Sequence, residues 1–248
     1  MLEIKNLSYQ VDADGEELGI LQGIDLTIPD GRLVVITGPN GGGKTTLAKT
    51  IMGLVKPTAG QILWNGTDIT GLSITERSKL GVSYAFQQPP RFKGLRIGDL
   101  LALAAGKELT HAQQCSYLTR VGLCANDYIG REMDASLSGG EVKRVEIATV
   151  LARGAELMIF DEPEAGIDLW SFSQLTKTFR ALHAEGSATL LIISHQERII
   201  ELADDLVLVS KGRIEAHGPK EDILPKLLRG NIAVERSCYG KKEVESRG

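Results

Sequence analysis

A glycine-rich loop that ends in a lysine and two threonines carries the clearest chemistry in this 248-residue sequence. The segment fits the pattern of one glycine, four free positions and then Gly-Lys-Ser/Thr, and its residues are Gly38, Pro39, Asn40, Gly41, Gly42, Gly43, Lys44, Thr45 and Thr46. Glycines let the backbone approach a ligand closely, and successive N–H groups at a helix N-terminus hold an anion. The loop therefore predicts a nucleotide site in which Lys44 reaches the β- and γ-phosphates and the Thr45 hydroxyl binds Mg²⁺.

The segments on either side of this loop have the pattern that such a site requires. Residues 33–36 are apolar and mostly β-branched, which predicts a buried strand. Residues 46–52 have the pattern of a helix start. A glycine-rich turn that binds nothing is the alternative, and the order of strand, loop and helix disfavours it.

A pair of carboxylates supplies the second half of the predicted site. The apolar run at 157–160 ends in Asp161 and Glu162. A carboxylate at the carboxyl end of a buried strand can hold Mg²⁺ directly or through water, so Asp161 is predicted to bind the metal. Glu162 could polarise the attacking water as a general base. A strand that is followed by an acidic turn of no function is the alternative.

A second turn of the phosphate-binding type lies far from the first in sequence. Ser138, Gly139 and Gly140 are followed by Glu141 and by residues 142–144, which read as the start of a helix. A serine and two glycines at a helix start predict a second nest of N–H groups for phosphate. One chain therefore carries two phosphate-binding loops.

Together these motifs resemble those of the ABC-type ATPases, the ATP-binding-cassette nucleotide-binding domains, over roughly residues 1–218. The resemblance implies an α/β fold: a P-loop NTPase core with a mostly parallel sheet, an N-terminal antiparallel β subdomain and a helical insert. The helical subdomain is expected at about 88–150, and a C-terminal helix or tail at 219–248. The implied activity is hydrolysis of ATP to ADP and phosphate, with ATP and Mg²⁺ as cofactors.

The hydrophobic pattern agrees with this architecture. Alternation of apolar and polar residues over 1–30 predicts antiparallel strands. Helical periods within 72–135 predict a mostly helical insert. The apolar runs at 157–160 and 190–193 have the length of buried parallel strands, and the helix expected at 170–185 between them completes a β-α-β unit.

The resemblance also implies roles for residues outside the two loops. Tyr9 stands where the family places an aromatic ring that stacks on adenine. Gln87 resembles the glutamine that senses Mg²⁺ and the γ-phosphate and supports catalysis, with Gln88 as a competing choice. Asp168 resembles the aspartate that crosses to a partner subunit, and His195 the histidine that contacts the γ-phosphate.

In such a family member the Ser138–Gly140 loop is too far along the helical insert to reach its own P-loop. Two chains, or this chain and a homologue, would sandwich two ATP molecules head to tail across a two-fold interface. Hydrolysis would separate the two halves and move whatever binds near Gln87 and the helical insert.

Several details resemble one branch of the family, the ATPase subunits of the SUF iron–sulfur cluster assembly system (SufC-like). They lie in Lys143 and Arg144 after the second loop, and in residues 85–89, 164–168 and 194–200. This resemblance implies a soluble β-helical scaffold protein as partner. The alternative is the cytoplasmic ATP-binding subunit of an ABC membrane transporter, with a transmembrane permease as partner. A regulatory or DNA-repair ABC protein is a third possibility, but its coiled coils or duplicated cassettes are not seen.

Composition limits the other classes of function. Hydrophobic residues make up 42 % of the chain, charged residues 24 %, and the net charge is −4, so general nucleic-acid affinity is not expected. No apolar run approaches the roughly 18 residues that a membrane span requires, and the N-terminus is not a signal peptide. The odd number of cysteines fits no zinc or disulfide framework and suggests a reducing, cytoplasmic compartment, with Cys238 as an isolated thiol.

Overall fold

A six-stranded sheet forms the centre of the computed structural model, which describes residues 1–13 and 16–228. Its strand order is β12-β11-β3-β10-β9-β6. The strands are β3 (Leu33–Thr37), β6 (Val82–Ala85), β9 (Leu157–Asp161), β10 (Thr189–Ile193), β11 (Asp205–Ser210) and β12 (Arg213–Pro219). All neighbours pair in parallel except β11 and β12. Every residue of β3, β6, β9, β10 and β11 is buried, as expected for parallel strands covered on both faces.

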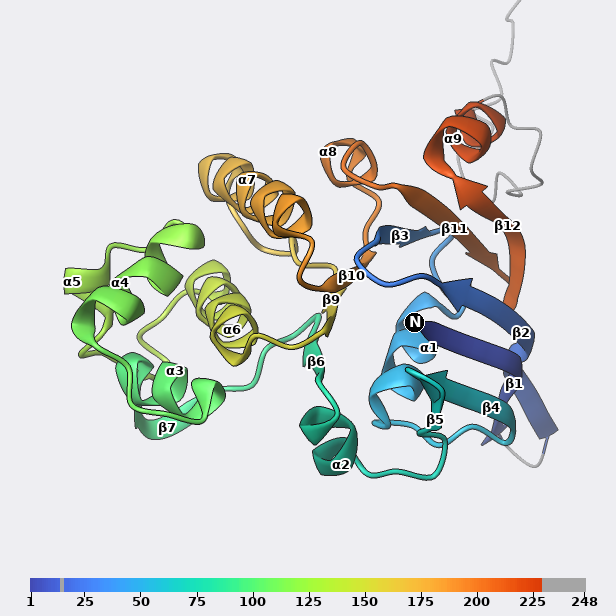
Figure 1. The fold of residues 1–248 in the computed structure, drawn as a ribbon, viewed down its shortest axis with the longest axis horizontal. Coiled ribbons are helices and arrows are strands. Elements are labelled where there is room, and N and C mark those ends of the chain that lie inside the picture. The colour runs from blue at the N-terminus through green and yellow to red at the C-terminus, as the bar shows by residue number, and fades with distance from the viewer. Residues whose placement is uncertain (14–15, 229–248) are drawn as a thin grey trace, which may run out of the picture.

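A second, antiparallel sheet covers one side of the core (Figure 1). Its order is β2-β1-β4-β5, from β1 (Leu2–Ala13), β2 (Glu16–Ile28), β4 (Ala59–Trp64) and β5 (Thr67–Asp68). Helix α1 (Lys44–Met52) lies between the two sheets, and its Leu47 and Ile51 share one apolar cluster with Leu2 of β1 and Val34 of β3. This packing fixes the helix that follows the P-loop.

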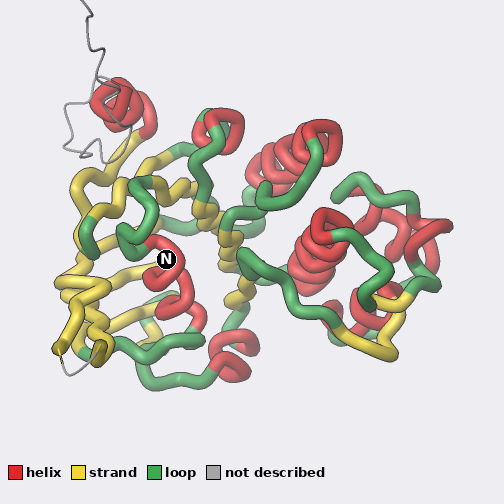
Figure 2. The backbone as a smooth tube through the Cα atoms, turned by 180° about the vertical axis from the view of Figure 1, so that it is seen from behind, coloured by secondary structure: helices red, strands yellow, loops and turns green. Residues whose placement is uncertain are grey.

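Helices pack on the opposite face of the central sheet. They are α6 (Gly139–Arg153), α7 (Leu169–Glu185), α8 (Glu197–Ile200) and α9 (Lys220–Leu228). Val145 of α6, Phe179 of α7 and Ile223 of α9 belong to the same buried cluster as Phe160 of β9. The view from behind shows α7 and α6 on the side of the strands that leads to a separate helical lobe, whereas α9 lies at the opposite end of the molecule (Figure 2).

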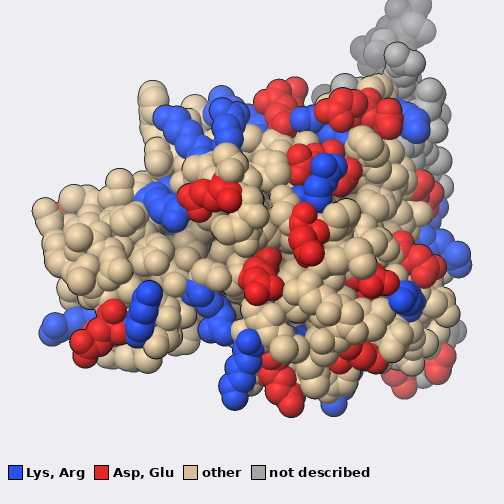
Figure 3. Space-filling view, viewed as in Figure 1, with Lys and Arg blue, Asp and Glu red and all other residues tan. Residues whose placement is uncertain are grey.

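The helical lobe stands on α6 and is built from residues that precede this helix in sequence. It contains β7 (Phe92–Arg96), α3 (Ile97–Ala105), α4 (His111–Arg120), α5 (Ala125–Tyr128) and β8 (Glu132–Met133). Its apolar side chains continue the cluster around α6, including Leu101, Leu118 and Met133. Helix α2 (Ile74–Lys79) lies at the edge of the core near β6. Basic and acidic side chains are interspersed over the face in Figure 3.

The α/β fold with a mostly parallel sheet, an antiparallel N-terminal sheet and a helical insert is confirmed. The expectation of a mostly helical stretch over 72–135 was wrong for Val82–Ala85, which is an edge strand of the central sheet. The run is only four residues long and its pairing with β9 comes from a segment more than 70 residues away, so local periodicity cannot reveal it. No helix among residues 1–13 and 16–228 is long and apolar enough to cross a membrane. Cys238 lies outside the described residues.

Candidate active site

The P-loop crosses from the end of β3 to the start of α1 and lies against β11. Gly38 has φ +134°, and a Cβ there would stand 2.1 Å from the Val209 carbonyl oxygen, so only glycine fits. Gly43 is the N-cap of α1 with φ 104°. The loop from Asn40 to Thr46 lines a cavity of about 410 Å³ together with Ile20, Gln87 and Glu162. The cavity therefore opens at the N-terminal, positive end of α1.

The Lys44 ammonium group lies across this loop. Its Nζ donates to the carbonyl oxygens of Gly38 at 2.8 Å and Pro39 at 2.9 Å. Burial lowers the pKa of Lys44, and Glu162 and Asp161 oppose that shift. A cation held only by backbone carbonyls at the lip of an N–H nest can contact phosphate oxygens without breaking an ion pair.

Asp161 ends β9 as a fully buried carboxylate. The Thr45 hydroxyl donates to its Oδ1 at 3.1 Å, and the Tyr84 hydroxyl donates to its Oδ2 at 2.7 Å. Burial raises the pKa of Asp161, and the two hydrogen bonds oppose that shift. The Thr45 hydroxyl and the Asp161 carboxylate form a set of hard oxygen donors beside the cavity, which fits Mg²⁺.

Glu162 follows in a strained backbone conformation. Its φ is 46°, in the left-handed region, where a side chain other than glycine costs of order 1–3 kcal/mol. Its N–H donates to the Ile193 carbonyl at 3.0 Å, which fixes the turn to β10. Its Oε2 accepts a hydrogen bond from Gln87 Nε2 at 2.7 Å. Both side chains line the P-loop cavity, so the geometry favours Gln87 over Gln88 as the glutamine of the site.

His195 lies on the other side of the P-loop start. It lines a neighbouring cavity of about 530 Å³ with Thr37, Pro39 and Asn40. Desolvation lowers the pKa of His195, Lys44 lowers it further, and Glu162 opposes both. The imidazole is therefore neutral at pH 7 and able to donate one hydrogen bond.

Besides His195, the predicted site residues outside the P-loop cavity include the second loop, Asp168 and Tyr9. Ser138 caps α6 at the base of the helical lobe, and Gly139 and Gly140 form its first turn. Asp168 caps α7 by accepting from the N–H groups of Trp170 and Ser171, both at 3.0 Å. Tyr9 pairs with Leu21 and packs on the apolar cluster of the N-terminal sheet, whereas Ile20 lines the cavity.

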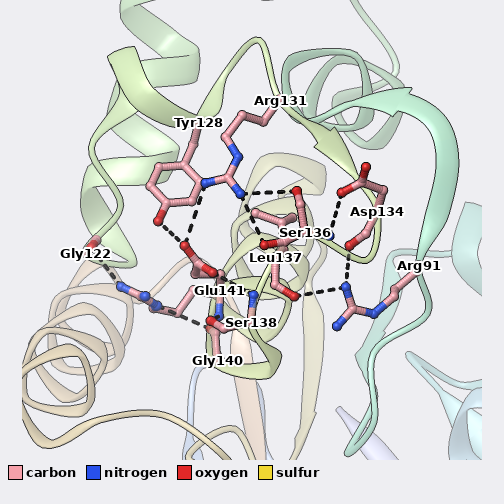
Figure 4. A network of polar contacts seen from close by, with 11 residues as sticks. Arg91, Gly122, Tyr128, Arg131, Asp134, Ser136, Leu137, Ser138, Gly140 and Glu141 are labelled. Carbon is pink, nitrogen blue, oxygen red and sulfur yellow. Dashed lines mark hydrogen bonds and ion pairs between the residues drawn. The ribbon is translucent and has the colours of Figure 1, made fainter.

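The loop Ser138–Gly140, predicted from sequence as a second phosphate-binding loop, is held by a polar network (Figure 4). Glu141 Oε2 accepts from the Ser138 N–H at 2.6 Å, and the Ser138 hydroxyl accepts from the Glu141 N–H at 3.3 Å. Glu141 Oε1 accepts from the Tyr128 hydroxyl and lies 3.8 Å from Arg131. These contacts, the Tyr128 bond first, lower the pKa of Glu141 to about 2. The loop is thus fixed before any ligand binds.

Three residues at the site were not predicted from sequence as site residues. Tyr84 binds Asp161, and Lys143 and Glu146 of α6 bind the backbone around Gln87. Tyr84 gives no local signal. Lys143 and Glu146 do give a signal in the sequence, because they are charged residues three positions apart among apolar residues on the buried face of a helix.

The fold and the site define a nucleotide-hydrolysing cassette, and comparisons with known proteins agree. Residues 21–165 match the family described as ABC transporter. An uncharacterized ABC transporter ATP-binding protein of Methanocaldococcus jannaschii, MJ0035, is 40 % identical over 211 residues, which cover 82 % of this chain and 84 % of that protein. The sulfate/thiosulfate import ATP-binding protein CysA of Synechocystis sp. is 36 % identical over 89 % of this chain, but the match spans only 61 % of CysA.

A solved structure shows the same fold. The dimeric post-hydrolysis state of the ATP-binding cassette MJ0796 bound to ADP and Pi has a TM-score of 0.81 over 89 % of this chain and 99 % of that chain, at 22 % identity. The chain belongs to the ABC transporter family and is an ATP-binding cassette with ATPase activity. The SUF iron–sulfur branch is not supported by these matches, because the relatives carry the names of transporter and import ATP-binding proteins.

Proposed function

We propose that the chain is the cytoplasmic ATP-binding subunit of an ABC membrane transporter, with a permease on a separate chain. The observation that carries the proposal is the set of relatives at 30 % identity or more, which includes sulfate/thiosulfate and spermidine/putrescine import ATP-binding proteins. These substrates differ chemically, and the chain spans about three fifths of the length of those import proteins. The proposal therefore names no transported substrate.

The arrangement of the cavity supports a role for each side chain. Lys44 and the N–H groups of the P-loop hold the β- and γ-phosphates, and Thr45 and Asp161 hold Mg²⁺, which neutralises phosphate charge. Glu162 accepts a proton from the attacking water, and Gln87 orients that water and the metal. His195 contacts the γ-phosphate. Tyr9 retains its proposed role against adenine.

A second copy would complete the site. Gly139 and Gly140 present their N–H groups in the first turn of α6, next to Ser138, and none of these three residues lines the cavity of its own chain. A head-to-tail dimer would bring this loop, and Asp168, onto the nucleotide of the partner subunit. ATP would then join the two chains, and its hydrolysis would release them.

The proposed docking site for the permease is a groove beside residues 86–91, the segment that contains Gln87 and is called the glutamine segment below. It has a volume of about 220 Å³ and lies between α2, α3, β6 and α6, with Ile74, Phe86, Ala104 and Arg153 in its lining. Ile74 is 41 % exposed, and Leu103, next to Ala104, is 65 % exposed. Phe86 directly precedes Gln87, so an occupant of the groove touches the segment that reaches the cavity.

The second candidate is the ATPase subunit of a SUF-type system, with a soluble scaffold in the same groove. One residue that carries that resemblance has a defined role here, because Lys143 is buried against the backbone of Phe86 and Gln87. The match to MJ0035 covers most of both chains, and the name of MJ0035 mentions no transported substrate.

The two candidates are separated by trapping the ATP state. Glu162→Gln removes the general base, which typically supplies about 10²–10⁴-fold in rate, while leaving the phosphate contacts in place. The variant is expressed in its native host and purified with ATP and Mg²⁺ from membrane and soluble fractions separately. We expect a polytopic membrane protein in stoichiometric amounts. A stoichiometric soluble partner without membrane spans would overturn the transporter proposal in favour of the SUF-type one.

A matched pair of variants tests the groove. Ile74→Asp in the Glu162→Gln background places a charge in the groove at the first position of α2, where an acidic residue suits the helix. Leu18→Asp, on β2, changes another exposed aliphatic side chain, 54 % exposed, away from the groove. We expect the partner to be lost only with Ile74→Asp, and ATP-dependent dimerisation by size exclusion to persist in both. Partner binding that survives Ile74→Asp would place the docking site elsewhere.

A further inference from the structure

Helix α6 buries a lysine and a glutamate on the face that it turns toward the core. Lys143 is 1 % exposed and Glu146 is 7 % exposed, and Lys143 Nζ lies 3.7 Å from Glu146 Oε2. Removing two charges from water costs more than their attraction returns, unless further hydrogen bonds complete the pair. The groups that supply these further hydrogen bonds therefore decide what the pair holds in place.

The partners of this pair lie in the segment that leads to Gln87. The Phe86 N–H donates to Glu146 Oε1 at 2.8 Å. Lys143 Nζ donates to the Phe86 carbonyl and, at 3.5 Å, to the Gln87 carbonyl. The two charged groups thus hold the peptide groups on both sides of Phe86, immediately before the glutamine whose side chain contacts Glu162.

The same ammonium group reaches the strand that carries the catalytic carboxylates. Lys143 Nζ donates to the backbone carbonyl of Asp161 at 3.2 Å. Lys143 stands on the helix that Ser138 caps, in the turn after the second phosphate-binding loop. One side chain therefore contacts the backbone next to both Gln87 and Glu162, and it belongs to the helix that carries the loop proposed to bind the partner's nucleotide.

Arg91, at the C-terminal end of the glutamine segment, binds the backbone just before the start of α6. Arg91 Nη1 donates to the Leu137 carbonyl at 3.0 Å and to the Asp134 carbonyl (Figure 4). The segment from Phe86 to Arg91 is thus bound near the start of α6 at both ends. It cannot move independently of the second phosphate-binding loop without breaking these bonds.

We propose that Lys143 and Glu146 are positioning residues for ATP hydrolysis, which bind the glutamine segment to α6 so that Gln87 and the Ser138–Gly140 loop move as one body. A partner in the groove, which Phe86 lines, would then shift Gln87 and the Ser138–Gly140 loop together, relative to Glu162. The inference rests on the role proposed above for Gln87 and not on whether the partner is a permease or a scaffold.

The test is a double-mutant cycle. Lys143→Met combined with Glu146→Leu replaces the pair by apolar side chains, a change that buried pairs often tolerate. We expect kcat to fall by about 10- to 100-fold because the glutamine is misplaced, with KM for ATP changed by less than about threefold. When Gln87→Ala is added to this variant, kcat should fall by less than about a further twofold relative to the variant without it, because the two changes act on one interaction. Thermal unfolding confirms that each variant is folded.

Arg77 supplies the matched control. It is also 1 % exposed and donates to backbone carbonyls, those of Thr50 and Ile51, but it lies on α2 away from the glutamine segment. Arg77→Lys combined with Gln87→Ala should show effects on kcat that multiply. Multiplying effects for the Lys143–Glu146 variant as well, or an unchanged kcat in it, would overturn the inference.

Two further measurements keep the outcomes distinct. If the double variant does not fold, Lys143→Gln and Glu146→Gln enter the same cycle singly. If Gln87→Ala alone leaves kcat unchanged, the proposed role of Gln87 fails, and this inference with it. A loss with Gln87→Ala that multiplies with the loss from the pair overturns only the coupling proposed here.

Discussion

At the scale of single residues, the proposed metal site depends on how a buried carboxylate stays ionised. Asp161 has no exposed surface, and burial raises its pKa. Its two oxygens are satisfied by the hydroxyls of Tyr84 and Thr45. Hydrogen bonds that donate to the ionised form favour it, so Tyr84 prepares Asp161 for a cation without touching the nucleotide.

Tyr84→Phe tests this role. The variant leaves a buried carboxylate oxygen without its donor, which costs about 1–3 kcal/mol in the free energy of unfolding. The pKa of Asp161 should rise further, so we expect the Mg²⁺ concentration for half-maximal ATPase activity to increase several-fold at pH 6.5, and less at pH 8. Steady-state hydrolysis across a magnesium titration measures it. Tyr117→Phe on α4 is the control, and an equal magnesium requirement in both variants would contradict the role.

At the scale of elements, the start of α6 shows why the second loop is rigid. Helix N-termini leave several N–H groups without helical partners, and a capping box satisfies two of them. Both α2 and α6 have one, formed by Ser73 with Glu76 and by Ser138 with Glu141. Only Glu141 has additional partners, Tyr128 and Arg131.

Glu141→Ala and Glu76→Ala therefore form a matched pair. Each removes one half of a capping box and leaves the N–H of the N-cap serine without its carboxylate partner. We expect Glu141→Ala to lower the melting temperature more, by at least about 2 °C beyond Glu76→Ala, since it also leaves Tyr128 and Arg131 without their carboxylate. Because the pKa of Glu141 is lowered to about 2, its stabilisation is present above about pH 4.5 and lost as the pH falls toward 2. Equal shifts for the two variants would show that the Tyr128 and Arg131 contacts contribute nothing.

The elements also show what sequence can and cannot predict. The strand 157–161 and the P-loop are readable because their signals are local: a continuous apolar run, and glycines at fixed spacing before Lys44. Strand β6 was not predicted because a run of four residues is too short to show a hydrophobic period. The roles of Tyr84 and Glu146 could not be predicted for another reason, because their hydrogen-bond partners lie in distant segments that come together only in the folded protein.

At the scale of the whole molecule, three buried carboxylates gather around one lysine. Glu146, Asp161 and Glu164 all act on Lys143, and burial raises the pKa of each, that of Glu146 to about 7. A carboxyl group whose pKa is higher in the folded chain than its ordinary value near 4.5 holds its proton more tightly there. Its contribution to stability is then full below about pH 4.5 and lost as the pH rises through about 7.

The nucleotide-free protein should therefore become less stable between pH 5.5 and pH 8, and Glu146→Gln should flatten this slope because an amide has no proton to lose. Glu146 faces Lys143, the Phe86 N–H and Asp161. The slope that remains in Glu146→Gln reports the other groups with shifted pKa values, among them Asp161 and Glu164, and His195, whose lowered pKa acts in the opposite direction. Melting temperatures by calorimetry at half-unit pH steps measure both slopes. Glu141→Gln is the control, since the pKa of Glu141 lies below this range and its slope should equal that of the wild type. A Glu146→Gln slope that also equals the wild-type slope would mean that Glu146 keeps one charge state throughout, and that Lys143 holds it ionised even in the absence of nucleotide.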